Sequence, residues 1–307
     1  MKVEKVIELV GYSKPTIYEK VKSLNIDVET TETNRNIFRW KDIVKLKYNK
    51  LYGTARHSPI VLSICQNKGG VGKTTSVINL ATALSYIGKT LMIDLDGQAN
   101  LSESFNLDYD YTLTDIISDN SIILDSVVNV SPSLDLIPNN IKFDRWKKRR
   151  KVEDTDQFIL RGLINSLKND YQFIIIDTPP SLDISLEMAF FASDYCIIPF
   201  QPQDFGIGGV ANIHEEIEIL KSEDKTNSLN LKVLGMFVTL NEKVNLSQQI
   251  NQAMIKKYNV FETMISKTVS LPESQTMTQS IFDYNEASPA STDYYNLTFE
   301  ILERILK

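Results

Sequence analysis

A glycine-rich segment between two strongly patterned neighbours constrains the fold of this chain more than any other feature. The apolar run Ile60–Cys65 before it is typical of a buried parallel strand. After it, Thr74–Leu84 places apolar residues at helical spacing. Residues 66–75, which join the two, read Gln-Asn-Lys-Gly-Gly-Val-Gly-Lys-Thr-Thr. Strand, glycine loop and helix in this order predict a phosphate-binding loop.

The glycines explain how such a loop would bind its ligand. Gly69, Gly70 and Gly72 have no Cβ, so the backbone can approach a phosphate closely and direct its N–H groups inward. The helix N-terminus adds partial positive charge. We expect Lys73 to reach the β- and γ-phosphates and the Thr74 hydroxyl to ligate Mg²⁺. A glycine-rich turn that binds nothing is the alternative, which the flanking elements disfavour.

One lysine departs from the usual phosphate-binding pattern. The usual spacing has a glycine five residues before Gly72, where this chain has Asn67 followed by Lys68. The resulting order, Lys-Gly-Gly-x-Gly-Lys-Thr-Thr, is the deviant Walker A form. A second basic group is not needed to hold one nucleotide, so Lys68 indicates that a dimer forms.

Carboxylates follow two further strand-like runs. Lys89–Ile93 leads into Asp94 and Asp96, whose i, i+2 spacing directs both side chains to the same side. At the carboxyl edge of a parallel sheet, where ligands bind, one could order Mg²⁺ and the other position the attacking water. A solvated acidic turn is the alternative. Phe173–Ile176 ends at Asp177, which is typical of a Walker B carboxylate that holds Mg²⁺ through its hydration shell.

The alternation of strands and helices predicts the fold class. Tyr195–Pro199 and Leu231–Leu240 are strand-like, and a helical pattern over Ile207–Leu220 separates them. From residue 60 onward we therefore expect an α/β fold with a doubly wound, mostly parallel sheet, as in P-loop NTPases. With 307 residues, the chain has room for a small first domain at 1–57 and an ATPase domain at 58–307.

The first 57 residues differ in charge from the rest. They carry twelve Lys/Arg against seven Asp/Glu, whereas the remaining chain carries 21 against 32. Val3–Val10 reads as a short helix, Gly11 as a turn, and Ser13 as the cap of a helix that runs from Thr16 to Leu24. Such a basic helix-turn-helix is typical of a nucleic-acid contact.

A hairpin wing over 35–40 and a helix from Lys41 would complete a winged helix-turn-helix, an order that resembles MerR-like winged helices. A small helical cap used only for dimerisation is the alternative. The DNA-binding candidates are Ser13, Lys14, Thr16, Tyr18, Lys20, Lys22, Arg35 and Arg39.

Cysteine usage and hydropathy exclude several other classes of protein. Cys65 and Cys196 sit in apolar runs and are expected to be buried free thiols of a reducing compartment. The two histidines, His57 and His214, have no usual zinc spacing to these cysteines. The N-terminus has no apolar signal core, and no run approaches the ~20 residues of a membrane span. A cytoplasmic protein is the expectation.

Residues 60–307 resemble the ParA/Soj family of DNA-partition ATPases, within the deviant Walker A group that includes MinD. The resemblance rests on the loop at 68–75, on Asp-Leu-Asp-Gly-Gln-Ala-Asn at 94–100 and on Asp-Thr-Pro-Pro at 177–180. Segments 199–209 and 239–249 also resemble the family. The N-terminal DNA-binding module is similar to that of larger ParA proteins, which repress their own operon.

The resemblance implies a role for each matching residue. Lys68 would reach the partner's phosphates across a sandwich dimer, where its charge acts as an arginine finger does. Asp96 would orient the hydrolytic water, and Asp94 would support the switch segment and the metal. Metal contacts are expected from Thr74, Asp96 and Asp177, and nucleotide contacts from Lys68, Gly69, Gly70, Val71, Gly72, Lys73, Thr74, Thr75, Asp94, Thr239 and Pro272.

The switch segment also departs from the family. Where the family usually has Asp-Pro-Gln-Gly-Asn, this chain has Gly97 in place of Pro and Ala99 in place of Gly. Asp96 and Asn100 are kept, so hydrolysis is expected, while the stiffness of the segment and the rate stay open.

The function that the resemblance implies is DNA segregation. ATP and Mg²⁺ would close a homodimer that binds non-specific DNA, and a centromere-bound ParB-type partner would stimulate hydrolysis. The protein would then be cytoplasmic and nucleoid-associated, with the N-terminal module repressing its own promoter. One alternative is a nucleotide-switched transcription or replication regulator.

A MinD-like membrane ATPase is a further alternative, which the acidic residues in the apolar stretch Asn296–Lys307 disfavour. That stretch is expected to pack in the core. A basic cluster around Trp146, from Arg145 to Lys151, has no family counterpart. It could be a solvated helix start, a patch for DNA phosphates or a polybasic membrane patch.

Overall fold

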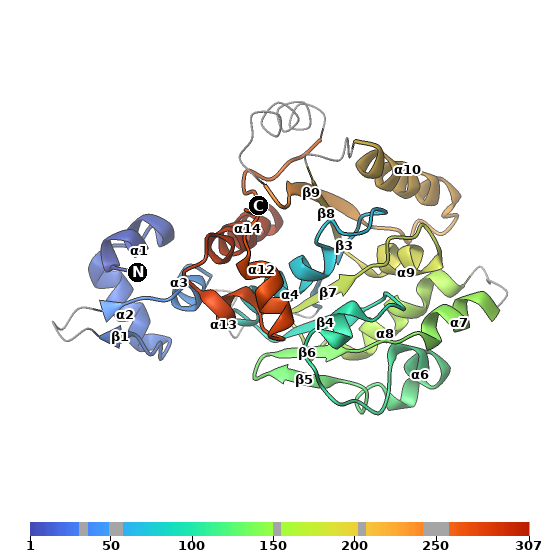
Figure 1. The fold of residues 1–307 in the computed structure, drawn as a ribbon, viewed down its shortest axis with the longest axis horizontal. Helices are drawn as coiled ribbons and strands as arrows, with labels where there is room; N and C mark the ends of the chain where they lie inside the picture. Colours follow the sequence, from blue (N-terminus) through green and yellow to red (C-terminus); the bar gives the residue numbers. More distant parts are fainter. Residues whose placement is uncertain (31–35, 49–57, 150–154, 202–206, 242–257, 307) are drawn as a thin grey trace.

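A seven-stranded sheet forms the centre of the molecule (Figure 1). The computed structural model describes residues 1–30, 36–48, 58–149, 155–201, 207–241 and 258–306, and the sheet is counted within these ranges. Its strands are β3 (Ile60–Ile64), β4 (Thr90–Asp94), β5 (Val128–Ser131), β6 (Leu134–Ile137), β7 (Phe173–Asp177), β8 (Tyr195–Phe200) and β9 (Lys232–Val238). Their order is β5-β6-β4-β7-β3-β8-β9, with β5 antiparallel to β6 at one edge and the other pairs parallel. The predicted α/β fold with a mostly parallel sheet is confirmed.

The central strands are buried on both faces, which explains their continuous apolar sequences. Every residue of β3, β4 and β7 is buried. Alternate side chains enter different cores: Leu62 and Ile64 join one cluster, and Val61 joins another. Strands covered on both sides in this way have apolar residues at most positions, unlike strands with one wet face.

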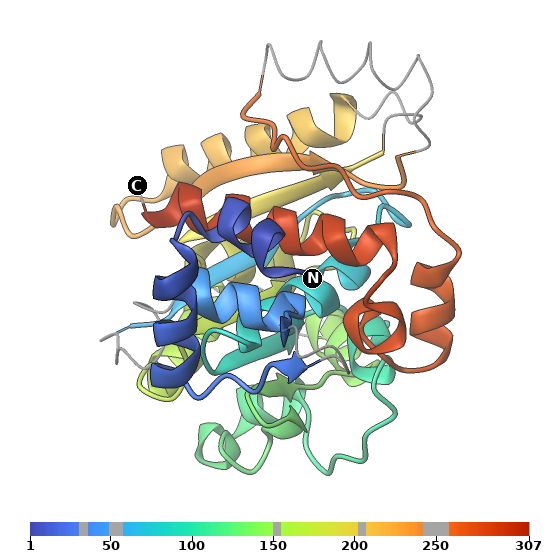
Figure 2. The same cartoon turned by 90° about the vertical axis from the view of Figure 1, so that its left-hand side faces the viewer.

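Helices cover both faces of the sheet (Figures 1 and 2). One face packs against α4 and α14, and the other against α6, α8 and α9. The helices of this part are α4 (Lys73–Ser85), α5 (Asn100–Glu103), α6 (Leu113–Ser118), α7 (Lys142–Arg149), α8 (Ile159–Leu167), α9 (Ile184–Ala192), α10 (Ile207–Glu223), α12 (Ser270–Thr276), α13 (Ile281–Asn285) and α14 (Pro289–Leu306). The helix predicted from Ile207 is α10, which continues to Glu223.

The C-terminal helix lies in the core, as its sequence predicts. Leu297, Phe299, Ile301 and Leu302 of α14 are buried. No helix in the described ranges is long and apolar enough to cross a bilayer.

Residues 1–48 form a small N-terminal module beside this sheet. Its elements are α1 (Val3–Val10), α2 (Lys14–Ser23), β1 (Glu29–Thr30), β2 (Asn36–Ile37) and α3 (Trp40–Lys47). Gly11 ends α1 with φ of 72°, a left-handed conformation that glycine adopts without strain. Ser13 caps α2 by accepting a hydrogen bond from Thr16 N at 3.4 Å. The helix over Val3–Val10 and the cap at Ser13 are confirmed, and α2 begins at Lys14 with Pro15 in its first turn.

The module lies against α14 (Figure 2), and aromatic side chains make the contact. The Trp40 ring stacks on Tyr295 with centroids 5.1 Å apart, and Tyr48 Oη donates to the Phe299 carbonyl at 3.1 Å. Lys47 Nζ adds an ion pair to Glu303 at 2.8 Å. The expected boundary between residues 57 and 58 falls at the edge of a segment outside the described residues.

Candidate nucleotide-binding site

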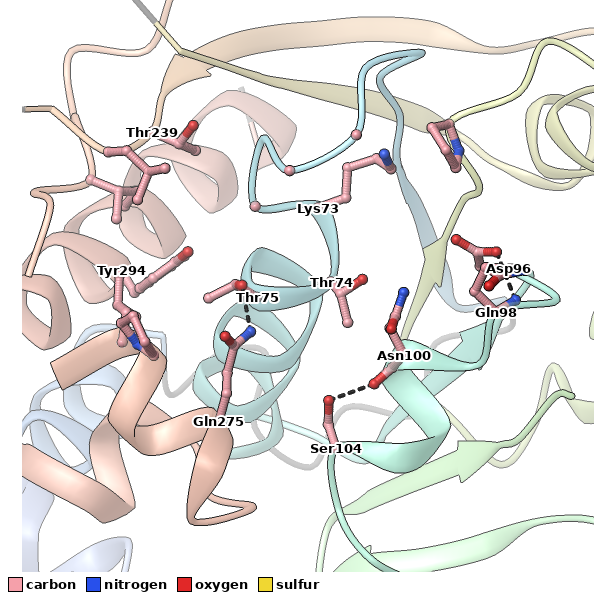
Figure 3. Close-up of a pocket in the computed structure, with 18 residues that line it drawn as sticks. Lys73, Thr74, Thr75, Asp96, Gln98, Asn100, Ser104, Thr239, Gln275 and Tyr294 are labelled. Carbon is pink, nitrogen blue, oxygen red and sulfur yellow. Dashed lines mark hydrogen bonds between the residues drawn. The ribbon is translucent and has the colours of Figure 1, made fainter. Parts of the chain in front are cut away.

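The glycine loop between β3 and α4 lines a pocket of about 610 Å³ at the carboxyl edge of the sheet (Figure 3). Gly70 and Gly72 have φ of 73° and 83°, so a side chain at either position would strain the turn that starts α4. An ideal Cβ on Gly69 or Gly70 would meet nothing within 4 Å, since the loop faces open space. The remaining walls come from Thr74, Thr75, Asp96, Gln98, Asn100, Ser104, Pro180, Thr239, Leu240, Ile265, Leu271, Pro272, Gln275 and Tyr294.

Lys73 and Thr74 lie at the start of α4, where the sequence predicts them. Lys73 is 8% exposed, and its Nζ donates to the Lys68 carbonyl at 3.1 Å. Burial lowers the pKa of this ammonium, and the carboxylates of Asp177 and Asp96 oppose the shift. Thr74 Oγ1 donates to Asp177 Oδ2 at 2.7 Å. A cation and a hydroxyl therefore face the pocket from one helix turn.

The environment of Asp177 fits a bound divalent cation. Its side chain is buried at the end of β7, and Oδ1 has no hydrogen-bond partner among the described residues. Burial raises the pKa of Asp177 to about 8, and the charge of Asp94 adds to the shift. An orphaned carboxylate oxygen beside a threonine hydroxyl is the oxygen-donor setting that Mg²⁺ prefers, directly or through its waters.

Asp94 and Asp96 have different surroundings although they lie only two positions apart. Asp96 lines the pocket, and its Oδ1 accepts from Gln98 N at 2.9 Å. Asp94 is completely buried behind the pocket. Its oxygens accept from Asp96 N at 3.0 Å and from Ser102 N and Oγ at 2.9 and 2.6 Å. Asp94 was predicted to support the switch segment and to contact the nucleotide. Its hydrogen bonds hold the segment that carries Asp96, and it is not among the described residues that line the pocket.

The conformation of Ala99 shows why the family usually has glycine there. Ala99 has φ of 59°, in the left-handed region, and precedes the first turn of α5. This conformation costs an alanine about 1 kcal/mol or more, whereas glycine adopts it freely. The switch segment, residues 94–100, therefore has a left-handed turn at Ala99 that strains the backbone.

The wall opposite Asp96 comes from the C-terminal third of the chain (Figure 3). Thr239 Oγ1 donates to the carbonyls of Val71 and Phe200 at 2.9 and 3.2 Å, which ties β9 to the loop. Gln275 Nε2 donates to Thr75 Oγ1 at 2.7 Å. Thr239 and Pro272 line the pocket, as expected of contacts to a nucleotide base.

Several lining residues were not predicted from sequence: Ser104, Ile265, Gln275 and Tyr294. They belong to no motif, and packing of distant segments brings them to the loop. For Gln275 and Tyr294, helical patterns near the C-terminus were the available signal, but these patterns do not show which helix face meets the pocket.

Lys68 lies outside the pocket wall. Its side chain is exposed at the tip of the loop and is not among the described lining residues. Val71 is buried behind the loop, where its carbonyl accepts the hydrogen bond from Thr239. Among the described lysines, Lys73 is the one that lines the pocket.

The DNA-binding candidates lie in the N-terminal module, away from the pocket (Figure 1). Lys14 and Lys22 are exposed on α2, and Lys20 Nζ lies 4.9 Å from the centre of the Tyr12 ring. The Thr16 hydroxyl bonds Ser13, and Tyr18 packs against the core. Arg39 forms an ion pair with Glu29 beside the small hairpin. Arg35 lies outside the described residues.

Two further predictions concern thiols and metals. Cys65 and Cys196 are both buried, and neither forms a disulfide, as predicted. No group of three or more His, Cys, Asp or Glu side chains in the described ranges is arranged to hold a metal ion.

Known proteins resemble this chain in sequence over most of its length. The model of the AAA domain family matches residues 60–233. Protein MJECL24 of Methanocaldococcus jannaschii is 33% identical over 261 residues, which cover 80% of this chain and 99% of that protein. The sporulation initiation inhibitor protein Soj of Bacillus subtilis is 29% identical, covering 78% of this chain and 97% of Soj.

Solved structures with the same fold hold nucleotides. A plasmid partition protein of Borrelia burgdorferi bound to AMPPNP is 28% identical, with a TM-score of 0.65 over 81% of this chain and 98% of that one. A cobyrinic acid a,c-diamide synthase of Mycobacterium smegmatis with ADP and magnesium has a TM-score of 0.70 over 81% of this chain and 96% of that one; at 23% identity it shows the fold alone. The chromosome-partitioning ATPase Soj of Treponema pallidum is 30% identical, covering 79% of this chain and 97% of that protein. With the family match, this relative shows that the chain belongs to the ParA/Soj-like family of partition ATPases.

Proposed function

We propose that this protein is a DNA-partition ATPase that binds ATP and Mg²⁺ in the pocket at the glycine loop. The observation that carries the proposal is the pairing of Thr74 with Asp177, whose second oxygen is buried beneath that loop without a partner among the described residues. Relatives named as partition or chromosome-partitioning proteins support the biological role.

The residues around the loop divide the work of hydrolysis. Backbone N–H groups at Gly69–Gly72 and the Lys73 ammonium hold the phosphates. Thr74 and Asp177 would hold Mg²⁺, which would supply positive charge to the phosphate oxygens. Asp96, in the opposite wall, orients the attacking water and is held in place through Asp94.

A second subunit completes the site in this proposal. Lys68 is exposed at the loop tip, so its ammonium can reach the phosphates bound by a partner subunit. Such a charge in trans stabilises the transition state and makes hydrolysis depend on dimerisation. The ATP-bound homodimer binds the DNA of the nucleoid in the cytoplasm. A ParB-type partner stimulates ATP hydrolysis, and the dimer then leaves the DNA.

Two lysine variants test this assignment. Lys73→Ala should abolish ATP binding, because it removes the buried cation of the pocket. Lys68→Ala should keep ATP binding but lose ATP-dependent dimerisation and hydrolysis. Nucleotide binding by fluorescence, dimerisation by sedimentation velocity and phosphate release give the three readouts. A Lys68→Ala protein that dimerises and hydrolyses ATP normally would refute the role in trans.

A nucleotide-switched regulator is the second candidate, and one observation favours it. Adjacent residues of α14 face two different parts of the molecule: Tyr294 lines the pocket, and Tyr295 stacks on Trp40 of the N-terminal module. A change at the pocket could therefore reach the module that carries Ser13, Lys14, Thr16, Tyr18, Lys20 and Lys22.

Binding to random duplex DNA and to the protein's own promoter, each with ATP, ADP and no nucleotide, separates the two candidates. Binding to random DNA with ATP alone supports the partition ATPase, with the N-terminal winged helix-turn-helix adding autorepression. Binding confined to the promoter, or equal in all three states, favours the regulator.

A further inference from the structure

Helix α7 presents a basic face to solvent. Lys142, Arg145, Lys148 and Arg149 are the cations of this face. Their spacing of three and four residues places them along one side of the helix. On the other side Phe143 is buried, and the partly buried Trp146 stacks on it with ring centroids 5.6 Å apart. These four cationic residues are the basic stripe of α7; Arg150 and Lys151, which come next in sequence, lie outside the described residues.

The cations of this stripe make few ion pairs with other described residues. Lys142 is 3.7 Å from Asp115, with 58% of its side chain exposed. No ion pair between described residues involves Arg145, Lys148 or Arg149. From residue 58 onward the chain is strongly acidic, with 32 Asp/Glu against 21 Lys/Arg. Four neighbouring cations repel one another, and this repulsion lowers the stability of the folded protein unless bound anions offset it.

The inner side of α7 contacts both loops that flank the nucleotide pocket. Lys147 Nζ is 3.1 Å from Asp144 Oδ1 and 3.0 Å from Asp183 Oδ2. Asp183 caps α9 just after the Asp177 loop. Asp144 lies so close to Gly97 that a Cβ there would be 2.5 Å from its Cγ. A shift of either loop on nucleotide binding would therefore reach the basic stripe.

We propose that the basic stripe of α7 is a docking surface for the phosphate backbone of duplex DNA. This inference rests on the proposed function, because it assigns the surface through which the ATP-bound form binds DNA without sequence preference. Lys142 to Arg149 spans about 10 Å of helix axis, which matches a few successive phosphates of one strand. Two arginines among the four favour phosphate, which their planar guanidinium groups bind bidentately.

The structure favours DNA over a lipid surface. A helix that binds a membrane buries an apolar face in the lipid headgroups. The apolar residues of α7, Phe143 and Trp146, face the protein core instead. Ile141, exposed just before the helix, supplies only one aliphatic side chain toward such a face.

Two triple variants with the same charge change test the inference. Arg145→Gln, Lys148→Gln and Arg149→Gln together remove three charges of the stripe. Lys168→Gln, Lys225→Gln and Lys232→Gln remove three exposed charges after α8, after α10 and at the start of β9, away from the stripe. Affinity for a random-sequence duplex is measured with ATP and Mg²⁺ over a salt series, with thermal unfolding as the check on folding.

The stripe variant should bind about 10- to 100-fold more weakly than the unmodified protein at moderate salt. The slope of log affinity against log salt should fall by about 2 to 3, as expected for three lost phosphate contacts. The matched variant should keep the original slope to within about 0.5. If the triple variant unfolds, the single variants Arg145→Gln, Lys148→Gln and Arg149→Gln should each lower the slope by about 0.9.

Three outcomes would overturn the inference. Equal slopes for the stripe variant and the unmodified protein would exclude this surface and leave the proposed ATPase untouched. If the stripe variant lost the binding of the unmodified protein to phosphatidylglycerol vesicles but kept its DNA affinity, the stripe would be a membrane-binding surface. An unmodified protein that binds ATP but no random duplex would remove the DNA step from the proposed function and this surface with it.

Discussion

Two neighbouring strand ends carry the same residue in the same position and use it differently. Asp94 of β4 and Asp177 of β7 are partners in the parallel ladder, and both are fully buried. Asp94 accepts three hydrogen bonds, from Asp96 N, Ser102 N and Ser102 Oγ. Asp177 accepts one from Thr74, and its Oδ1 has no partner among the described residues.

The path of the chain after each strand explains the difference. After Asp94 the chain turns back through α5, which brings the N–H and hydroxyl of Ser102 to the carboxylate. After Asp177 come Pro179 and Pro180, which have no N–H to donate. Burial raises the pKa of both groups, to about 6 for Asp94 and about 8 for Asp177. The first carboxylate accepts three hydrogen bonds from the protein, whereas one oxygen of the second accepts none from the described residues.

The largest expected effect comes from Asp177→Asn. ATP hydrolysis should fall at least about 100-fold, because the amide cannot hold the metal ion. The free energy of unfolding of the metal-free protein should stay within about 1 kcal/mol or rise, because a poorly solvated carboxyl is removed. Phosphate release and urea unfolding measure the two effects, with Asp170→Asn, an exposed carboxylate before β7, as control. A large loss of stability without loss of activity would show that Asp177 is structural.

Asp94→Asn should show the reverse pattern. The amide group cannot accept all three hydrogen bonds, so the free energy of unfolding should fall by about 2 kcal/mol. Ser102→Ala removes the hydroxyl that donates to Asp94 and accepts from Asn139 N at 2.8 Å, and should cost about 1 kcal/mol. ATP affinity at a temperature where both variants are folded should change less than tenfold. An Asp94→Asn protein that keeps its stability but loses nucleotide would mean that Asp94 contacts the ligand.

The stability of the metal-free protein should also depend on pH through Asp177. Its pKa rises from 3.8 to about 8 on folding, so between these values the folded state holds more protons than the unfolded state. Stability should then fall as pH rises from about 4 to about 8, by about 1.4 kcal/mol per pH unit at most. Urea unfolding in EDTA measures this slope. If Asp177→Asn retains the full slope, other groups cause it.

Local motifs account for the part of this site that sequence can predict. Lys73 and Thr74 follow a glycine turn whose geometry is set within a few residues, and Asp177 ends an unmistakable buried strand. The resemblance implied that Asp94 supports the switch segment and that Asp177 holds the metal. The hydrogen bonds from Ser102 to Asp94 were not predictable, because Ser102 reaches Asp94 only after the chain has turned through α5.

Tertiary packing decides the rest. Gln275 meets Thr75 across 200 positions of sequence, and no periodicity records such a contact. Strands β5 and β6 have no counterpart in the sequence-based prediction, since their short runs give little pattern. Caps and apolar spacing predict the helices of the N-terminal module. The position of the module against α14 was not predictable, because it depends on a contact between Trp40 and Tyr295, which are far apart in sequence.

Gly97→Ala is the smallest expected effect, and it tests how firmly the loop after β4 is held from outside. The new Cβ would lie 2.5–2.7 Å from the Asp144 carboxyl atoms. That group ends a flexible side chain, so it can rotate away at a cost of about 1 kcal/mol or less, while Lys147 keeps its pair with Asp183. Gly162→Ala is the matched control, because its Cβ meets nothing within 4 Å and alanine should stabilise α8 by about 1 kcal/mol. Urea unfolding of both variants measures the difference. If the free energy of unfolding fell by more than about 3 kcal/mol for Gly97→Ala, α7 would hold the loop after β4 rigidly. The two strand ends would then also differ in how the helices outside them fix their loops.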